Sequence, residues 1–259
     1  MSGAAVKPLN PERRRVLNDA QWLQAMGIDP FWIESPANPV APASAAAHDA
    51  RIAAPTEPSN LTATRNVAQI PATDWTALET TIRECRGCSL CKGRKQAVPG
   101  SGDRQARWLI VGEAPGADED AAGLPFVGKA GKLLDAMLAA LDLKRDQGVY
   151  LTNTVKCRPP ENRTPESAEM DACSSFLSQQ IDLLAPEVIV ALGKPAAAAL
   201  LGHADSIQSL RGAVQYREQG GKRIPVVVTY HPAYLLRQPE EKWKSWQDLL
   251  LARSVLAGR

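Results

Sequence analysis

Four cysteines have a spacing that could hold a metal ion or an inorganic cluster. Cys85 and Cys88 form a C-x2-C pair, and Cys157 and Cys173 follow later, 16 residues apart. Four thiolates can bind zinc or an iron–sulfur cluster. Cys91 extends the first group to C-x2-C-x2-C, so spacing alone leaves open which pair is used. We expect one thiolate-bound centre here; the alternative is a set of unligated thiols.

A glycine-rich segment, "GEAPGADEDAAGLPFVGKAG", covers residues 112–131. Its glycines permit tight turns and close approach of a ligand to the backbone. N–H groups near residue 129, where a helix should begin, can face an anion. Glu113 is a candidate for orienting a water molecule. Phe126, one of 3 phenylalanines, is a candidate for stacking on a planar ligand; the alternative is that it packs beneath the loop.

Two polar side chains follow other apolar segments. Asn153, in "TNTVKCRPPENR", offers a donor and an acceptor that match the edge of a nucleobase; the alternative is an asparagine that caps a turn. His231, in "HPAYLLR", is one of 3 histidines and the one that lies at a predicted strand end; the alternative is a structural histidine.

The elements that must position these residues alternate along the chain. Short apolar runs rich in Val, Ile and Leu predict buried strands at 107–112, 148–155, 187–193 and 224–230. Helical patterns separate or follow them at 131–143, 165–184, 194–202 and 240–256. This alternation predicts an α/β fold with a four-stranded parallel sheet flanked by helices. Ligands of such sheets bind beyond the carboxyl ends of the strands, where the candidate residues fall.

The amino-terminal third has a different composition. Residues 10–26 read as a helix, with Asn10 as N-cap and Gly27 as stop. Residues 36–60 are rich in Pro and Ala, and we predict a flexible linker over residues 36–73. We therefore divide the chain into a docking-peptide-like helix within 1–35, a linker at 36–73 and a globular domain at 74–259, with a disordered tail as the alternative for the extension.

Composition and charge set broad limits. No run of 18 apolar residues is present, and the start lacks the apolar stretch of a signal peptide, so a cytoplasmic protein with reduced cysteines is expected. The net charge is +2, but five basic residues fall between positions 83 and 95, beside the first cysteines. This basic group is compatible with phosphate contacts or with an ordinary charged surface.

The three quoted motifs, together with the cysteines, closely resemble family 4 uracil-DNA glycosylases over about residues 80–256, in that family's order. The resemblance implies a uracil-DNA glycosylase-like fold. It also implies a 4Fe-4S cluster held by Cys85, Cys88, Cys157 and Cys173, with Cys91 outside the ligand pattern. Its cofactor would be structural, because hydrolysis of an N-glycosidic bond needs no electron transfer.

The resemblance also implies a role for each candidate side chain. Glu113 corresponds to the residue that positions the attacking water. Phe126 corresponds to the aromatic residue that stacks on uracil, and Asn153 to the side chain that reads its polar edge. His231 corresponds to the histidine beside the carbonyl oxygen where negative charge develops.

Three further residues of the first motif take substrate-binding positions by the same resemblance. Glu119 would lie beside C5 of the pyrimidine and help to exclude the methyl group of thymine. Gly112 and Ala114 would lie beside the base. The sequence "GEAPG" differs from the "GEQPG" of the related crosslinking glycosylases, so ordinary turnover is expected.

Uracil in a duplex must be flipped out to reach such a pocket. An apolar wedge could fill the vacated stack, and we assign the DNA contact to Tyr234, Leu235, Leu236 and Arg237. Arg158 and Arg163 are expected to be available to phosphate. The products would be free uracil and an abasic site, and nothing in the sequence suggests more than a monomer.

The extension has a fainter resemblance of its own. The segment "LQAMGIDPFW" is similar to the peptide at the start of the clamp-loader psi subunit, which implies a clamp-loader contact through residues 10–35. Two other readings of the whole chain are a non-catalytic iron–sulfur nucleic-acid-binding accessory protein of replication and a zinc-bound phosphate-ester hydrolase. The sequence does not choose between single- and double-stranded DNA.

Overall fold

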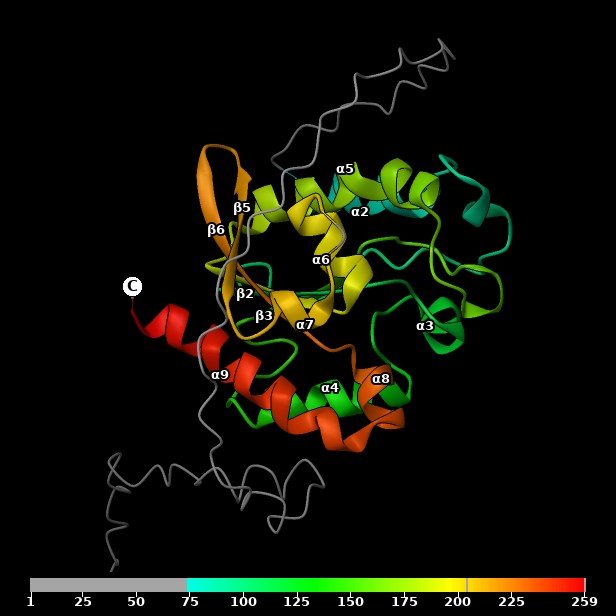
Figure 1. Ribbon diagram of the computed structural model, residues 1–259. Coiled ribbons are helices and arrows are strands. Elements are labelled where there is room, and N and C mark those ends of the chain that lie inside the picture. The colour runs from blue at the N-terminus through cyan, green and yellow to red at the C-terminus, as the bar shows by residue number, and fades with distance from the viewer. Residues whose placement is uncertain (1–73, 204, 259) are drawn as a thin grey trace, which may run out of the picture.

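The computed structural model describes residues 74–203 and 205–258. The helix expected at 10–26, the docking peptide within 1–35 and the linker at 36–73 lie outside the described residues. The described chain forms three layers, a central sheet with helices on both faces (Figure 1).

Within the described residues, the strands form one six-stranded sheet in the order β1-β3-β2-β4-β6-β5. The four inner strands run parallel, as predicted, and they are β2 (Trp108–Gly112), β3 (Val149–Asn153), β4 (Val188–Leu192) and β6 (Lys222–Thr229). The prediction of a purely four-stranded parallel sheet was wrong at its edges. The strands β1 (Ser101–Gly102) and β5 (Val214–Gln219) add to it antiparallel, so the sheet is mixed.

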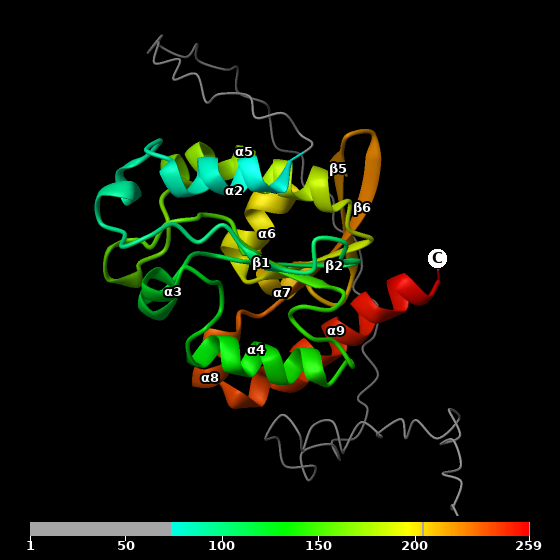
Figure 2. The same ribbon diagram turned by 180° about the vertical axis from the view of Figure 1, so that it is seen from behind.

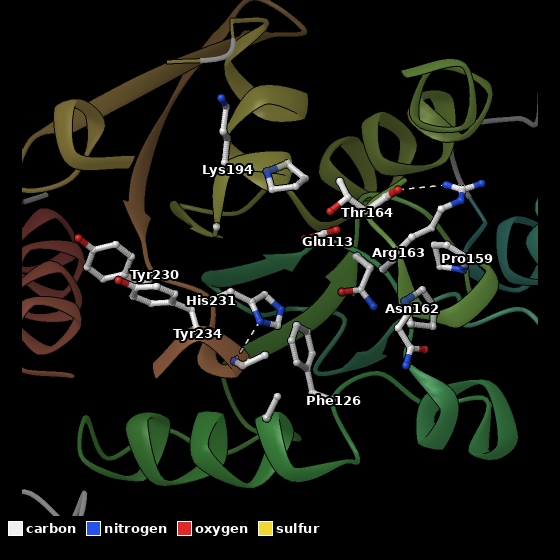
Figure 3. A pocket seen from close by; sticks show the side chains of 18 of the residues that line it. Glu113, Phe126, Pro159, Asn162, Arg163, Thr164, Lys194, Tyr230, His231 and Tyr234 are labelled. Carbon is white, nitrogen blue, oxygen red and sulfur yellow. Dashed lines mark hydrogen bonds between the residues drawn. The ribbon is translucent and has the colours of Figure 1, made fainter. Parts of the chain in front are cut away.

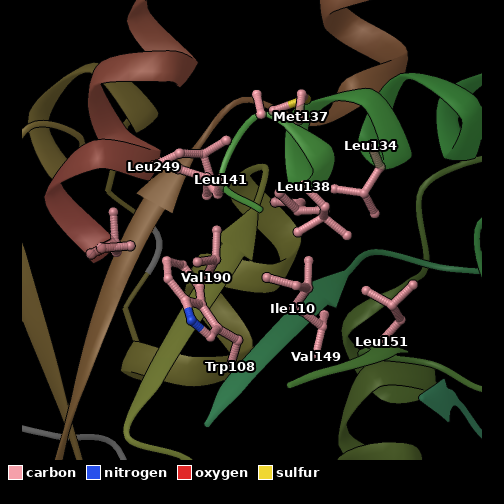
Figure 4. Packing of buried hydrophobic residues seen from close by; sticks show 14 of the residues in the cluster. Trp108, Ile110, Leu134, Met137, Leu138, Leu141, Val149, Leu151, Val190 and Leu249 are labelled. Atoms are coloured by element: carbon pink, nitrogen blue, oxygen red, sulfur yellow. The ribbon is translucent and has the colours of Figure 1, made fainter. Parts of the chain in front are cut away.

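Alternation along the inner strands explains why both faces of the sheet are covered. Ile110 belongs to one buried cluster and its neighbour Leu109 to another, because successive side chains of a strand point to opposite faces. The first cluster also contains residues of α4 (Lys129–Ala139), α8 (Pro232–Arg237) and α9 (Lys242–Ala257) (Figure 4). The second contains residues of α5 (Ser167–Leu184) and α6 (Lys194–Leu201). Figure 2 shows the same two helical layers from behind.

The helices α4, α5, α6 and α9 confirm the four predicted helical segments, with ends shifted by a few residues. The shorter helices α3 (Ala117–Ala122), α7 (Ile207–Leu210) and α8 were not predicted, and neither was α2 (Trp75–Glu84). Four to six residues are too few to show a helical period. One-turn 3-10 helices also occur at η2 (Ser89–Lys92), η3 (Pro160–Asn162) and η4 (Pro239–Glu241).

Helix α2 packs against α5, and their buried residues form a third, smaller hydrophobic cluster. Its buried residues Leu78 and Ile82 pack in one cluster with Phe176 of α5 and with Cys157 and Cys173. The cysteine region therefore lies beside one end of the sheet, next to the layer formed by α2 and α5. No helix among the described residues is long and apolar enough to cross a membrane.

The carboxyl ends of the inner strands meet at one edge. Gly112 at the end of β2 is paired in register with Asn153 at the end of β3. Gly193 directly follows β4, and its N–H donates to the carbonyl of Thr229, the last residue of β6. The predicted site residues come together beyond these strand ends.

Candidate active site

A cavity of about 710 Å³ lies beyond the carboxyl ends of the inner strands (Figure 3). Eight of the predicted site residues line it: Glu113, Ala114, Glu119, Phe126, Asn153, His231, Tyr234 and Arg237. Three other predicted residues, Gly112, Leu235 and Leu236, do not. Gly112 lies beneath the cavity, where its missing side chain leaves room for the residues above it.

Asn153 carries a polar atom without a partner. Its residue is 2% exposed, and its Oδ1 is buried and accepts no hydrogen bond. A buried polar atom left unpaired costs free energy, about 1–3 kcal/mol. A planar ligand with an N–H on its edge would remove that cost by donating to Oδ1. The cavity therefore offers a hydrogen-bond acceptor to a ligand.

His231 caps the first turn of α8, and this fixes its tautomer. Its Nδ1 accepts a hydrogen bond from the Ala233 N–H at 3.1 Å. The neutral ring therefore carries its proton on Nε2, which is left to donate. Burial lowers the pKa of His231 to about 4, and nearby Arg237 acts in the same direction. The ring is neutral at pH 7 and supplies a hydrogen-bond donor without a full charge.

Phe126 faces both the core and the cavity. It is 5% exposed, it belongs to the cluster around α4, and its ring centroid lies 6.0 Å from that of His231. Its φ of 55° lies in the left-handed region, which is uncommon for a residue other than glycine. The two readings of this residue are therefore not exclusive, because Phe126 packs in the core cluster and also lines the cavity.

Glu119 organises the loop that carries Phe126. One carboxylate oxygen accepts from the N–H groups of Val127 at 2.9 Å and Gly128 at 3.0 Å, and the other from the Gly116 N–H at 3.0 Å. Gly128 is the N-cap of α4. The anion expected at the start of this helix is thus a carboxylate of the chain itself.

Glu113 directly follows β2 and is half-buried. Burial raises the pKa of its carboxyl group above the ordinary value, while a hydrogen bond with the side chain of Thr164 acts in the opposite direction. Thr164 lines the same cavity. A carboxylate with a raised pKa next to a reaction centre is typical of a group that orients or deprotonates water.

The predicted DNA contacts of α8 divide into two groups. Leu236 is 45% exposed, whereas Leu235 is fully buried in the cluster that contains α4 and α9. The assignment of Leu235 to a wedge was wrong, because successive side chains of a helix point in different directions and that of Leu235 points into the core. Leu236 and the half-buried Tyr234 keep that assignment as a prediction.

A second, much smaller hollow is lined by all five cysteines. Cys157 and Cys173 are buried, and burial raises the pKa of Cys173 to about 12. Among the described residues, no group of three or more His, Cys, Asp or Glu is arranged so that it could hold a metal ion. The donor set consists of thiols alone, and in residue type it fits a soft metal centre such as an iron–sulfur cluster.

Arg94 joins the two halves of the cysteine set. Its Nη1 donates to the Cys157 Sγ at 2.7 Å, and its Nη2 donates to the carbonyl oxygens of Arg83 at 2.7 Å and Cys85 at 2.9 Å. A guanidinium so placed stabilises negative charge on the sulfur. The segment before the sheet and the loop after β3 are thereby held together by one side chain.

Lys156 connects the cysteine hollow with the active-site strand. It is 1% exposed, and its Nζ donates to the Asn153 carbonyl at 2.6 Å, to Gln180 Oε1 at 2.7 Å and to Thr152 Oγ1 at 2.8 Å. Burial lowers its pKa to about 8. Three acceptors satisfy all three donors of the ammonium group, so the end of β3 is fixed from below.

The loop after Cys157 is tied back to the protein. Glu169 accepts two hydrogen bonds from Arg163, at 2.7 and 2.9 Å, and one from Ser89 of η2 at 3.2 Å. Arg158 donates to Asn162 Oδ1 at 2.8 Å. The Arg163 guanidinium is thus engaged by Glu169, but it also lines the cavity and its side chain is 37% exposed, so the expectation that both arginines are available to phosphate stays a prediction.

Several residues that line the cavity were not predicted. Lys194 follows Gly193 at the end of β4, and the rule that ligands bind beyond strand ends could have found it. Tyr230 directly follows β6, so the same rule could have found it as well. Thr164 and Ile207 also line the cavity, but they come from a loop and from a short helix without a local signal.

The fold and this cavity define an α/β protein whose ligand site is assembled from four strand ends. The family model described as the uracil DNA glycosylase superfamily matches residues 99–250. Similar proteins include type-4 uracil-DNA glycosylases of Pyrobaculum aerophilum, 43% identical over 69% of this chain and 92% of that protein, and of Archaeoglobus fulgidus, 45% identical over 61% of this chain and 81% of that protein. A third, from Thermotoga maritima, is 44% identical over 68% of this chain and 91% of that protein. The chain therefore belongs to the uracil DNA glycosylase superfamily, and within it to the type-4 family.

Proposed function

We propose that this protein removes uracil from DNA by hydrolysing the N-glycosidic bond, leaving free uracil and an abasic site. One observation carries the proposal: the buried Asn153 Oδ1 without a partner lies in one cavity with Phe126, Glu113 and a neutral His231. The membership of the chain in the type-4 family supports the same activity.

The pairing pattern of Asn153 favours uracil over cytosine. Uracil offers an N–H at N3 and a carbonyl at C4, which match the carbonyl and amide of the side chain. Cytosine carries an acceptor at N3 and an amino group at C4, so with the amide in its present orientation both contacts would be reversed and a buried polar atom would stay unpaired. Phe126 would form the wall on which the flat base lies.

Bond cleavage leaves positive charge on the sugar and negative charge on the uracil ring. His231 would donate from Nε2 to the oxygen that gains charge, and one such donor is typically worth about 3–4 kcal/mol. A water molecule oriented by Glu113 would then attack the sugar. The nucleotide must first leave the duplex, at a cost of a few kcal/mol, and this cost is lowest for a mismatched base.

The second part of the proposal is a 4Fe-4S cluster held by Cys85, Cys88, Cys157 and Cys173. When bound, it would supply covalent crosslinks between the segment before the sheet, the loop after β3 and α5. Arg94 would donate to one of its sulfur ligands, as it donates to Cys157 now. Cys91 lines the same hollow and is not needed for four ligands.

The test of the activity is incubation with a uracil-containing oligonucleotide, followed by alkaline cleavage of abasic sites. We expect a single break at the uracil and none in matched oligonucleotides with cytosine or thymine. Binding of the DNA without release of uracil would favour the alternative of a non-catalytic accessory protein. Zinc in place of iron in the purified protein would overturn the cluster assignment.

Three expectations stay predictions within this proposal: a cytoplasmic location, a monomeric state and a clamp-loader contact through residues 10–35. The last depends on residues outside the described part of the chain. A peptide of residues 1–35 that fails to bind the clamp loader would dismiss it.

A further inference from the structure

Arg145 contacts the backbone of the loop that carries Phe126. Its Nη1 donates to the Pro125 carbonyl at 2.8 Å, and its Nη2 donates to the carbonyl of Phe126. The same Nη2 lies 3.4 Å from the carbonyl of Gly131 in the first turn of α4. Asp135 of α4 accepts from Nε at 2.5 Å and orients the guanidinium group.

The opposite side of this loop is held by Glu119. Arg145 takes the carbonyl groups of residues 125 and 126, and Glu119 takes the N–H groups of residues 127 and 128. Successive peptide groups are thus fixed from two sides by charged groups of opposite sign. Such hydrogen bonds are stronger than those between neutral groups.

Phe126 needs this support because its backbone is strained. A left-handed conformation is unfavourable for a residue other than glycine, because the Cβ atom comes too close to the following carbonyl oxygen. Helix α4 also packs so tightly on this point that a Cβ atom at Gly131 would lie only 1.7 Å from the carbonyl oxygen of Phe126. If the peptide group rotated, the ring would leave the cavity wall opposite His231.

We propose that Arg145 is a positioning residue that fixes the strained backbone of Phe126 and thereby holds its ring as the wall of the base pocket. Arg145 does not line the cavity, so its effect on the pocket passes through the loop that carries Phe126. The effect on uracil excision rests on the proposed function, whereas the effect on the loop does not.

The first test uses Arg145→Met and Arg145→Lys, which keep the approximate length of the side chain but remove the planar guanidinium group and its paired donors. Arg107→Met is the matched control, because Arg107 also makes a two-bonded ion pair, with Glu187, outside the cavity. We expect kcat/KM for a uracil oligonucleotide to fall about 10- to 100-fold in both Arg145 variants. The control should stay within about 2-fold.

A double-mutant cycle separates positioning from general destabilisation. In a Phe126→Leu background, Arg145→Met should lower kcat/KM by less than about 2-fold further, because the ring that it positions is gone. If kcat/KM of the double variant fell by the product of the two single losses, the two residues would act independently and the proposal would be overturned.

Hydrogen exchange tests the loop without any activity. In Arg145→Met, the amides of Val127 and Gly128 should exchange faster than in the wild type, while those of β2 stay protected. Unchanged exchange at residues 125–131 would refute the positioning role, even if the wild type releases no uracil. Absence of uracil release by the wild type, with faster exchange in the variant, would overturn the proposed function alone.

Discussion

Gly112 and Asn153 face each other across β2 and β3 with no room for a side chain between them. A Cβ atom at Gly112 would lie 2.4 Å from the Asn153 Oδ1 and 2.5 Å from Cζ of Phe126. The Asn153 Oδ1 atom, which has no partner, and the Phe126 ring therefore keep their places only because residue 112 has no side chain.

We expect Gly112→Ala to displace both groups and to slow uracil excision by roughly 100-fold, since small misplacements in an active site have effects of this size. Single-turnover rates on a uracil oligonucleotide measure the effect. Gly258→Ala is the control, because its added Cβ meets its nearest neighbour at an ordinary 3.6 Å. Wild-type rates in Gly112→Ala would show that the base does not bind against Asn153.

Asn153→Ala and His231→Ala should each slow excision by roughly 100-fold or more. The first change removes the partner for the edge of the base, and the second removes the Nε2 donor. Circular dichroism and thermal melting should show folded proteins in both cases. Full activity of both variants would reject the site.

The acid side of the pH profile should be set by Glu113 and not by His231. If catalysis needs the Glu113 carboxylate, as proposed, activity should fall as the pH drops through the pKa of this group, which burial raises above its ordinary value. His231 stays neutral until the pH approaches about 4. Measurement of kcat against pH should show the acid limb in His231→Gln, at a lower overall rate, and no such limb in Glu113→Gln. An acid limb that persists in Glu113→Gln would contradict this assignment.

Replacement of Cys173 by Ser should release iron and destabilise the domain, because ligand binding and folding are coupled at such centres. Iron content and visible absorbance of the purified protein measure the first effect, and thermal melting measures the second. Cys91→Ser is the matched control and should keep its iron. A Cys173→Ser protein with full iron content would remove Cys173 from the ligand set.

The neighbours Leu235 and Leu236 should separate stability from DNA binding. Leu235→Ala leaves a hole in the core and should lower the free energy of unfolding by about 2–5 kcal/mol. Leu236→Ala should leave stability nearly unchanged, because its side chain is 45% exposed, but weaken binding to duplex DNA. Equal binding of duplex by wild type and Leu236→Ala would exclude this wedge.

Much of the fold was predictable because its inner strands are apolar on both faces. Val190 and its neighbours in β4 are fully buried, and a short run of Val, Ile and Leu is typical of a strand covered on both sides. The edge strand β5 escaped prediction because Gln215, Arg217 and Glu218 make it polar. An edge strand pairs on one side only, so hydrophobic patterning constrains it weakly.

The site was predictable where its residues stand at strand ends. Asn153 and His231 were found by that rule, and both line the cavity. Arg145 was not found, because its importance lies in hydrogen bonds to main-chain carbonyls. Such contacts depend on the path of the loop and leave no pattern in neighbouring residues.

Asn153 and the buried Cys157 lie four residues apart on one short segment. Within this segment, the Lys156 ammonium group donates a hydrogen bond to the main-chain carbonyl of Asn153. If iron is held at those thiols, oxidants or iron starvation would loosen this segment before the sheet itself came apart. The capacity to recognise a damaged base would then depend on the supply of iron.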